Sequence, residues 1–137
     1  MWMSARMLRA ICVLLFATDS PWQSGHLISR ASRVERALTE SLAARAGRLL
    51  ALEIDGGLAA ALQARFADAP SVEILQADAR RFDYAGLRAR RPDPEGRVLV
   101  AGNLPYSVGK PILAALVESG AAIDEMTLML QKEVADR

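Results

Sequence analysis

Short apolar runs alternate with stretches of helical periodicity from residue 34 to the end of the chain, and this alternation limits the fold more than any other feature. Strand-like runs separated by helices of about ten residues are typical of βαβ units, whose strands lie parallel in one sheet. The sequence therefore predicts an α/β fold with a Rossmann-like, mostly parallel sheet and helices on both faces. The predicted helices are 34–46, 58–66 and 111–118, the predicted strands are 48–55, 72–76, 98–101 and 126–130, and 86–96 is a predicted loop.

Composition excludes several kinds of site. The 137 residues accommodate one domain, and an apolar fraction of 52% is typical of a globular protein. A net charge of +1 gives no indication of nucleic-acid binding by itself. Cys12 and His26 are the only cysteine and histidine, which excludes an internal disulfide and makes metal sites or triads built on these residue types unexpected.

The apolar run AICVLLFA at 10–17, preceded by Arg6 and Arg9, resembles a weak secretory signal. It is far shorter than the ~20 apolar residues needed to cross a membrane. A buried or spurious segment in a cytoplasmic protein is the favoured interpretation. No first strand is predicted before the helix at 34–46, because only Leu27 and Ile28 are adjacent apolar residues between the run and that helix.

Polar residues stand at or just beyond the ends of three predicted strands, at Glu53, Asp78 and Asn103. Ligands of parallel α/β sheets bind where the carboxyl ends of the strands converge. Glu53 can accept hydrogen bonds from two ribose hydroxyls, or it can be an ordinary solvent-exposed acid. Asp78 can accept a hydrogen bond from an adenine amine, or it can simply form a turn. Asp55 is a predicted N-cap of the helix that follows.

The stretch Asn103-Leu104-Pro105-Tyr106 directly follows an apolar strand and is the most informative motif. A nucleobase amine is a poor nucleophile because its lone pair is delocalised into the ring. The Asn103 side-chain oxygen and a backbone carbonyl can accept its two N–H bonds and draw the nitrogen toward tetrahedral geometry. Pro105 restricts Leu104 to an extended conformation, and Tyr106 offers a ring on which a flipped base can stack. The alternative is an Asn-x-Pro turn without a catalytic role.

The chain from Leu49 to Lys132 resembles the catalytic domain of the 16S ribosomal RNA adenine dimethyltransferases. The segments that carry the resemblance are ALTE (37–40), LLALEID (49–55), LQADA (75–79), VAGNLPYSVGKPIL (100–113) and MTLMLQKEVADR (126–137). The resemblance implies a methyltransferase fold that binds S-adenosylmethionine and methylates N6 of adenines in the 16S rRNA of the small ribosomal subunit. It implies no metal and no membrane association, and a monomer is expected.

The same resemblance implies roles for single residues. Glu53 would bind the ribose of the cofactor, and Asp78 with Ala79 would bind its adenine. Asn103 would lie against both cofactor and target base. The implied cofactor-binding residues are thus Glu53, Asp78, Ala79 and Asn103, and the implied catalytic residues are Asn103, Leu104, Pro105 and Tyr106.

The resemblance is lost upstream of residue 37. The family has a glycine-rich loop whose backbone approaches the cofactor closely, and Ser32, Val34 and Arg36 stand where its three glycines are expected. Residues 1–36 are therefore predicted to be a divergent or misread N-terminal segment, and residues 37–137 a partial catalytic domain without the family's C-terminal domain. We expect the chain to bind S-adenosylmethionine weakly or not at all.

Other functions stay open at this point. The missing glycines favour a non-catalytic remnant or an RNA-binding protein of the same fold, whereas the intact stretch from Asn103 to Tyr106 argues against one. A 23S rRNA methyltransferase of the antibiotic-resistance type is a close variant, although LPY and QKEVA fit the 16S type better. DNA adenine methyltransferases more often have Asp-Pro-Pro-Tyr at this motif.

Overall fold

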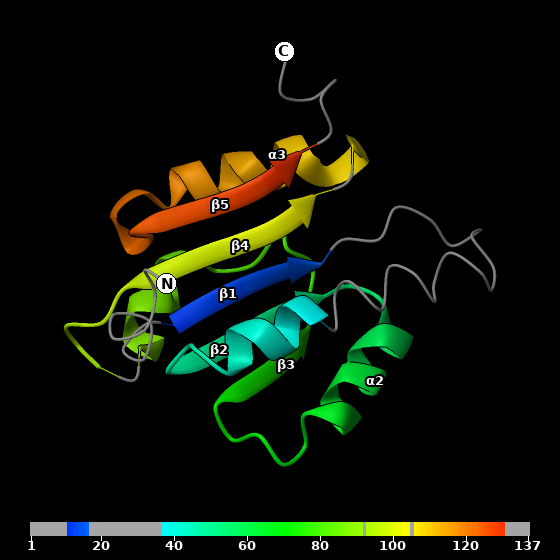
Figure 1. Ribbon diagram of the computed structural model, residues 1–137. Helices are drawn as coiled ribbons and strands as arrows, with labels where there is room; N and C mark the ends of the chain where they lie inside the picture. Colours follow the sequence, from blue (N-terminus) through cyan, green and yellow to red (C-terminus); the bar gives the residue numbers. More distant parts are fainter. Residues whose placement is uncertain (1–10, 17–36, 92, 105, 131–137) are drawn as a thin grey trace.

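The computed structural model describes residues 11–16, 37–91, 93–104 and 106–130. Within these residues a parallel sheet has the strand order β3-β2-β1-β4-β5 (Figure 1). The strands are β1 (Ile11–Phe16), β2 (Arg48–Glu53), β3 (Val72–Gln76), β4 (Val98–Leu104) and β5 (Glu125–Leu130). The strand order reverses at β1, and parallel α/β sheets bind their ligands at the carboxyl ends of the strands beside such a reversal.

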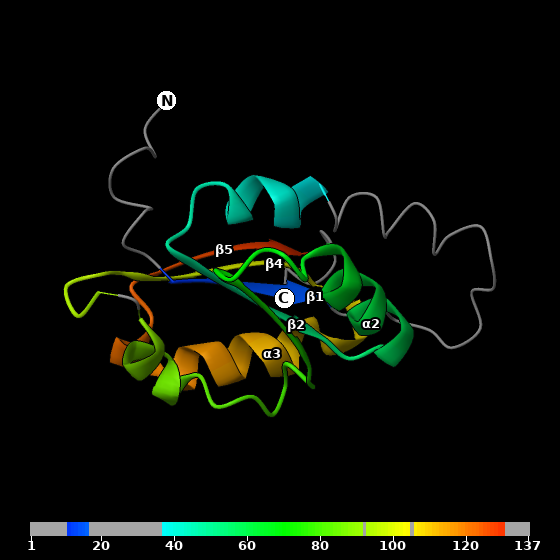
Figure 2. The same ribbon diagram turned by 90° about the horizontal axis from the view of Figure 1, so that it is seen from below.

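Helices cover both faces of the sheet (Figure 2). The helical segment 37–43 and α2 (Gly56–Arg65) pack on one face. The helix α3 (Tyr106–Glu118) lies on the other face, together with the short 3-10 helices η2 (Ala85–Arg90) and η3 (Gly120–Ala122). None of the helices in the described ranges is long and apolar enough to cross a membrane.

The side chains of β2 and β4 alternate between two cores. Leu50 and Leu52 of β2 are fully buried in the core beneath α3. Leu49 and Ala51 are fully buried in the core shared with 37–43 and α2. A strand buried on both faces needs an unbroken apolar run, which explains why β2 carries RLLALE rather than an alternating pattern.

β1 corrects one prediction made from the sequence. The run Ile11–Phe16 is the central strand, paired in parallel with β2 on one side and β4 on the other. The prediction that no first strand precedes the helix was wrong, since residues 11–16 of the apolar run at 10–17 form that strand. Parallel pairing joins residues far apart in the chain, so the apolar run alone did not reveal its partners.

Two boundaries beside the candidate motif also differ from the prediction. β4 extends through Asn103 to Leu104, and α3 begins at Tyr106 rather than at Pro111. Proline is preferred in the first turn of a helix, yet Pro111 lies inside α3, where it cannot donate a backbone hydrogen bond. The predicted loop 86–96 contains most of η2, which buries Leu87 completely.

Candidate active site

Glu53 and Asn103 lie at the same level near the carboxyl-terminal edge of the sheet. Both are register partners of Phe16, the last residue of β1, from opposite sides. Leu49 and Ala51 precede Glu53 on one face, and Leu99 and Ala101 precede Asn103 on that same face. With neighbouring strands about 4.8 Å apart, the two side chains therefore leave one face of the sheet about 10 Å from each other.

The Glu53 side chain is held by the turn between β2 and α2. Its Oε1 accepts a hydrogen bond of 2.8 Å from the backbone N–H of Asp55. Asp55 is the N-cap of α2, as predicted, because its Oδ1 accepts a hydrogen bond of 2.8 Å from the N–H of Leu58. Glu53 is fully buried, which excludes the alternative of a solvent-exposed acid.

Asp78 lies two residues past the end of β3. The preceding residue, Ala77, donates its N–H to the carbonyl oxygen of Glu53 at 3.0 Å, which keeps this segment beside β2. The Asp78 carboxylate accepts hydrogen bonds from the backbone N–H of Arg80 at 2.9 Å and from Arg80 Nη2 at 2.7 Å. The pKa of Asp78 lies below its ordinary value, mainly because the Arg80 side chain donates hydrogen bonds to the carboxylate. Asp78 therefore forms a turn and presents an ionised carboxylate.

Tyr84 anchors the loop that follows Asp78. Its hydroxyl donates a hydrogen bond of 2.6 Å to the carbonyl oxygen of Ala79, and both residues are buried. Burial raises the pKa of the Tyr84 phenol, and the nearby charge of Asp78 raises it further. This role of Tyr84 was not predicted from the sequence. The position of the tyrosine between a charged segment and a turn of small residues could have indicated it.

The end of β4 fixes the backbone of the candidate catalytic motif. Asn103 has register partners on both β1 and β5, and Leu104 has one on β5. The Leu104 side chain is buried in the core beneath α3, whereas Asn103 is exposed. The Asn103 amide is thus accessible on a rigid strand. Pro105 and the side chain of Tyr106 lie outside the described part of the structure.

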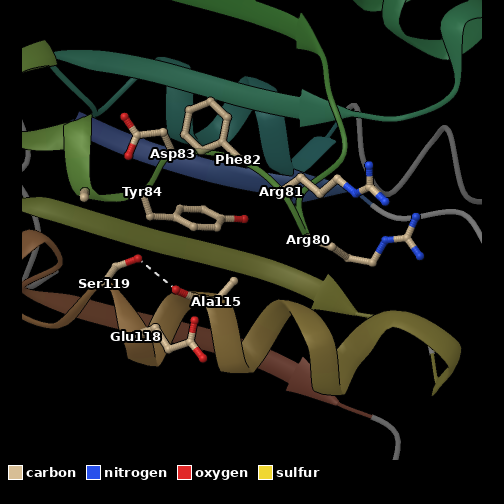
Figure 3. Close-up of a pocket in the computed structure, with 9 residues that line it drawn as sticks. Arg80, Arg81, Phe82, Asp83, Tyr84, Ala115, Glu118 and Ser119 are labelled. Atoms are coloured by element: carbon tan, nitrogen blue, oxygen red, sulfur yellow. Dashed lines mark hydrogen bonds between the residues drawn. The ribbon is translucent and has the colours of Figure 1, made fainter.

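A hollow of roughly 300 Å³ lies on the α3 side of the sheet (Figure 3). Residues 80–85 line it together with Ala115 and Glu118 of α3 and with Ser119, which directly follows that helix. The rings of Phe82 and Tyr84 meet edge to face there, with centroids 5.2 Å apart. The lining includes none of the three strand-end residues, and Glu53 and Asn103 belong to the opposite face. Because Arg80 lines the hollow and contacts Asp78, the hollow adjoins the Asp78 loop, but it lies on the face opposite Glu53 and Asn103.

The family model described as ribosomal RNA adenine dimethylase matches residues 35–137. The chain belongs to this family. The match begins downstream of β1, and it omits Ser32 and Val34, two of the three positions expected to be glycine in the dimethylase family. All three of these positions, Arg36 included, lie outside the described residues.

Curated relatives agree with the family assignment. Ribosomal RNA small subunit methyltransferase A of Koribacter versatilis is 44% identical over 109 residues, which cover 74% of this chain and 38% of the relative. The protein of the same name from Acidobacterium capsulatum is 46% identical over 101 residues, which cover 74% of this chain and 34% of the relative. The chain therefore spans little more than a third of the length of these relatives.

Solved structures confirm the predicted fold class. The 23S rRNA methyltransferase ErmE matches with a TM-score of 0.61 at 23% identity, covering 96% of this chain and 43% of that protein. A dimethyladenosine transferase from Plasmodium falciparum also matches with a TM-score of 0.61, at 19% identity, covering 93% of this chain and 38% of that protein. At these identities the likeness establishes the shared α/β fold alone.

Proposed function

We propose that the chain is part of an enzyme that transfers methyl groups from S-adenosylmethionine to N6 of adenines in small-subunit (16S) rRNA, in ribosome biogenesis. Family membership supports the reaction class. The observation that carries the proposal is that Glu53 and Asn103 flank the end of β1 on one face of the sheet. This is the point of strand reversal, where sheets of this kind bind nucleotides.

Glu53, Asp78 and Ala79 hold the methyl donor in this proposal. A carboxylate has about four lone-pair positions, so Glu53 can accept ribose hydroxyls while Oε1 still holds the N–H of Asp55. The ionised Asp78 carboxylate is a suitable acceptor for an adenine amine. When bound, S-adenosylmethionine supplies an electrophilic methyl group on a sulfonium centre. The backbone of Ala79, held by the Tyr84 hydroxyl, lies against the adenine beside Asp78 in this proposal.

Asn103 and Leu104 orient the target amine. The Asn103 side-chain oxygen and the Leu104 carbonyl oxygen accept its two N–H bonds, which leaves the nitrogen lone pair available for attack on the methyl group. Asn103 also borders the methyl donor. The pairing of β4 with strands on both sides supports this role. A backbone held on both sides keeps the target amine aligned with the methyl group, and misalignment would slow methyl transfer. Pro105 keeps Leu104 extended, and Tyr106 stacks on the flipped base.

The proposed substrate is the RNA of the small ribosomal subunit, bound by a cytoplasmic monomer. Relatives that are 44% and 46% identical carry the small-subunit name, whereas the likeness to the 23S methyltransferase extends to the fold alone. This difference favours the 16S type over the resistance type.

The test is methyl transfer to small ribosomal subunits that lack the adenine modification, with labelled S-adenosylmethionine. The chain is assayed with glycine at positions 32, 34 and 36, beside the same protein carrying Asn103→Ala. We expect N6,N6-dimethyladenosine in the digested 16S rRNA, formed more slowly by about a hundredfold or more with Asn103→Ala. Label in another base, or equal transfer by the two proteins, contradicts the proposed function.

A further inference from the structure

One residue, Arg80, contacts both oxygens of the Asp78 carboxylate. Its Oδ1 accepts hydrogen bonds from the backbone N–H of Arg80 at 2.9 Å and from Arg80 Nε at 3.0 Å. Its Oδ2 accepts hydrogen bonds from Arg80 Nη2 at 2.7 Å and from Nε at 3.1 Å. These four contacts come from three N–H groups, because the single Nε–H is shared between the two oxygens. They occupy most of the roughly four acceptor positions of the carboxylate, so a further donor competes with Arg80 for the same oxygens.

The neighbouring Arg81 shows that this arrangement is specific to Arg80. Figure 3 shows both guanidinium groups extending toward the carboxyl end of β4. The backbone N–H of Arg81 donates to the Asp78 carbonyl oxygen at 3.0 Å, but the Arg81 side chain affects the Asp78 carboxylate only through its charge. Within the described ranges no carboxylate lies within 4 Å of the Arg81 guanidinium. Of the two adjacent arginines, therefore, only Arg80 contacts the Asp78 carboxylate through its side chain.

We propose that the Arg80 guanidinium competes with the adenine ring of the methyl donor for the Asp78 carboxylate, so that Arg80 weakens adenine binding and sets its affinity. The inference rests on the proposed role of Asp78 as the adenine acceptor. An adenine amine that approaches Asp78 competes for the carboxylate oxygens with the fork, that is, with the hydrogen bonds from Arg80 Nε and Nη2. The backbone N–H of Arg80 can stay in place, because it occupies only one position on Oδ1.

The strength of the ion pair determines the size of the effect. The side chains of Arg80 and Asp78 are 44% and 23% exposed, so solvent screens their attraction. Breaking such an exposed ion pair costs little free energy. Loss of the Arg80 side chain should therefore change the affinity for adenine only about two- to fivefold. Salt weakens such pairs, so the competition declines as the ionic strength rises.

The experiment titrates the full 137-residue chain with adenosine and follows the backbone amide signals of residues 77–81 by NMR. Adenosine is uncharged, so salt acts on the protein pair rather than on the ligand, and weak binding remains measurable. The variants are Arg80→Met, which removes the fork and retains an unbranched side chain, and Arg81→Met as the matched control. Asp78→Asn is added to test the acceptor itself, and thermal unfolding of each variant verifies that it is folded.

We expect Arg80→Met to bind adenosine about two- to fivefold more tightly than the unmodified chain, and Arg81→Met to change the affinity less than twofold. Binding by the unmodified chain should tighten with added salt, whereas binding by Arg80→Met should not. Equal or weaker binding by Arg80→Met overturns the competition, because Arg80 then merely positions Asp78. Absence of adenosine binding both by the unmodified chain and by the chain with glycine at positions 32, 34 and 36, or unchanged affinity in Asp78→Asn, overturns the adenine site itself and so the cofactor part of the proposed function.

Discussion

Glu53 and Asn103 occupy equivalent positions on the two strands that flank β1. The shared register partner, Phe16, fixes this relationship through the backbone, independently of any side-chain conformation. Glu53 is buried and Asn103 is exposed, so one face of the sheet offers a protected carboxylate beside an accessible amide. The two side chains can therefore contact two different ligands that meet at the end of β1.

Replacement of Asn103 by alanine tests the positioning of the amine. With the proposed acceptor removed, we expect kcat for methyl transfer to fall about a hundredfold or more, because a misaligned amine reacts slowly. KM for S-adenosylmethionine should change little by comparison. Thr127→Ala is the matched control, since Thr127 is exposed on β5 beside the same face of β4. An equal loss of kcat in both variants would point to damage of the sheet instead.

Replacement of Tyr84 by phenylalanine tests the anchor of the Asp78 loop. The variant leaves the Ala79 carbonyl without its 2.6 Å hydrogen bond in a buried position. We expect the free energy of unfolding to fall by about 1–2 kcal/mol, measured by urea titration. A stability equal to that of the unmodified chain would show that the anchor contributes nothing.

Asp124 joins the starts of β4 and β5 to η2. Its Oδ2 accepts the Val98 N–H at 2.7 Å, and its Oδ1 accepts a hydrogen bond from Arg88 Nη2 at 2.8 Å. The pKa of Asp124 lies below its ordinary value, mainly because the Val98 N–H donates a hydrogen bond to the carboxylate. The hydrogen bond and charge of Arg88 lower it further. We expect Asp124→Asn to lower the free energy of unfolding by about 1–2 kcal/mol at neutral pH.

The pH dependence of that difference has a defined sign. A carboxyl with a depressed pKa in the folded state stabilises the fold above its unfolded pKa, and this contribution is lost as the pH falls through the folded value. The difference between the unmodified chain and Asp124→Asn should therefore shrink below about pH 4. Glu125→Gln is the control, because the Glu125–Arg97 pair is more exposed and should contribute little at any pH. A difference that is constant with pH contradicts the assignment.

Glycine at positions 32, 34 and 36 tests the interpretation of residues 1–36 as a divergent or misread segment. Without the long side chain of Arg36 and the branched Val34, the backbone can approach a cofactor closely. We expect the affinity for S-adenosylmethionine, measured by calorimetry, to rise at least about tenfold. Micromolar binding by the unmodified chain would contradict the expectation that these residues block the site.

Local signals in the sequence predicted the elements that form through short-range contacts. The bounds of β3 and the N-cap at Asp55 agree with the prediction, because apolar runs and capping side chains act within a few residues. The positions of Glu53 and Asp78 at strand ends followed from the same signals. The central place of β1 in the sheet did not follow from local signals, because it depends on pairing with β2 and β4, which lie far along the chain.

The hydrogen bonds around Asp78 also could not be predicted from the sequence. A pattern of residue types indicates that a carboxylate follows a strand, but it does not say which donor occupies it. The fork of Arg80 on Asp78 and the bond from Tyr84 to Ala79 depend on side-chain directions within one loop. The end of β4 was underestimated because Asn103 and Pro105 disfavour strands locally, while pairing on both sides of Asn103 outweighs that preference.

The most direct test of the account is a crystal structure with S-adenosylhomocysteine, the product of the methyl donor, bound to the chain with glycine at positions 32, 34 and 36. The account predicts the ribose hydroxyls on Glu53, the adenine amine on Asp78 and the sulfur atom facing Asn103. A ligand bound instead in the hollow between residues 80–85 and the end of α3, or away from the end of β1, would contradict it.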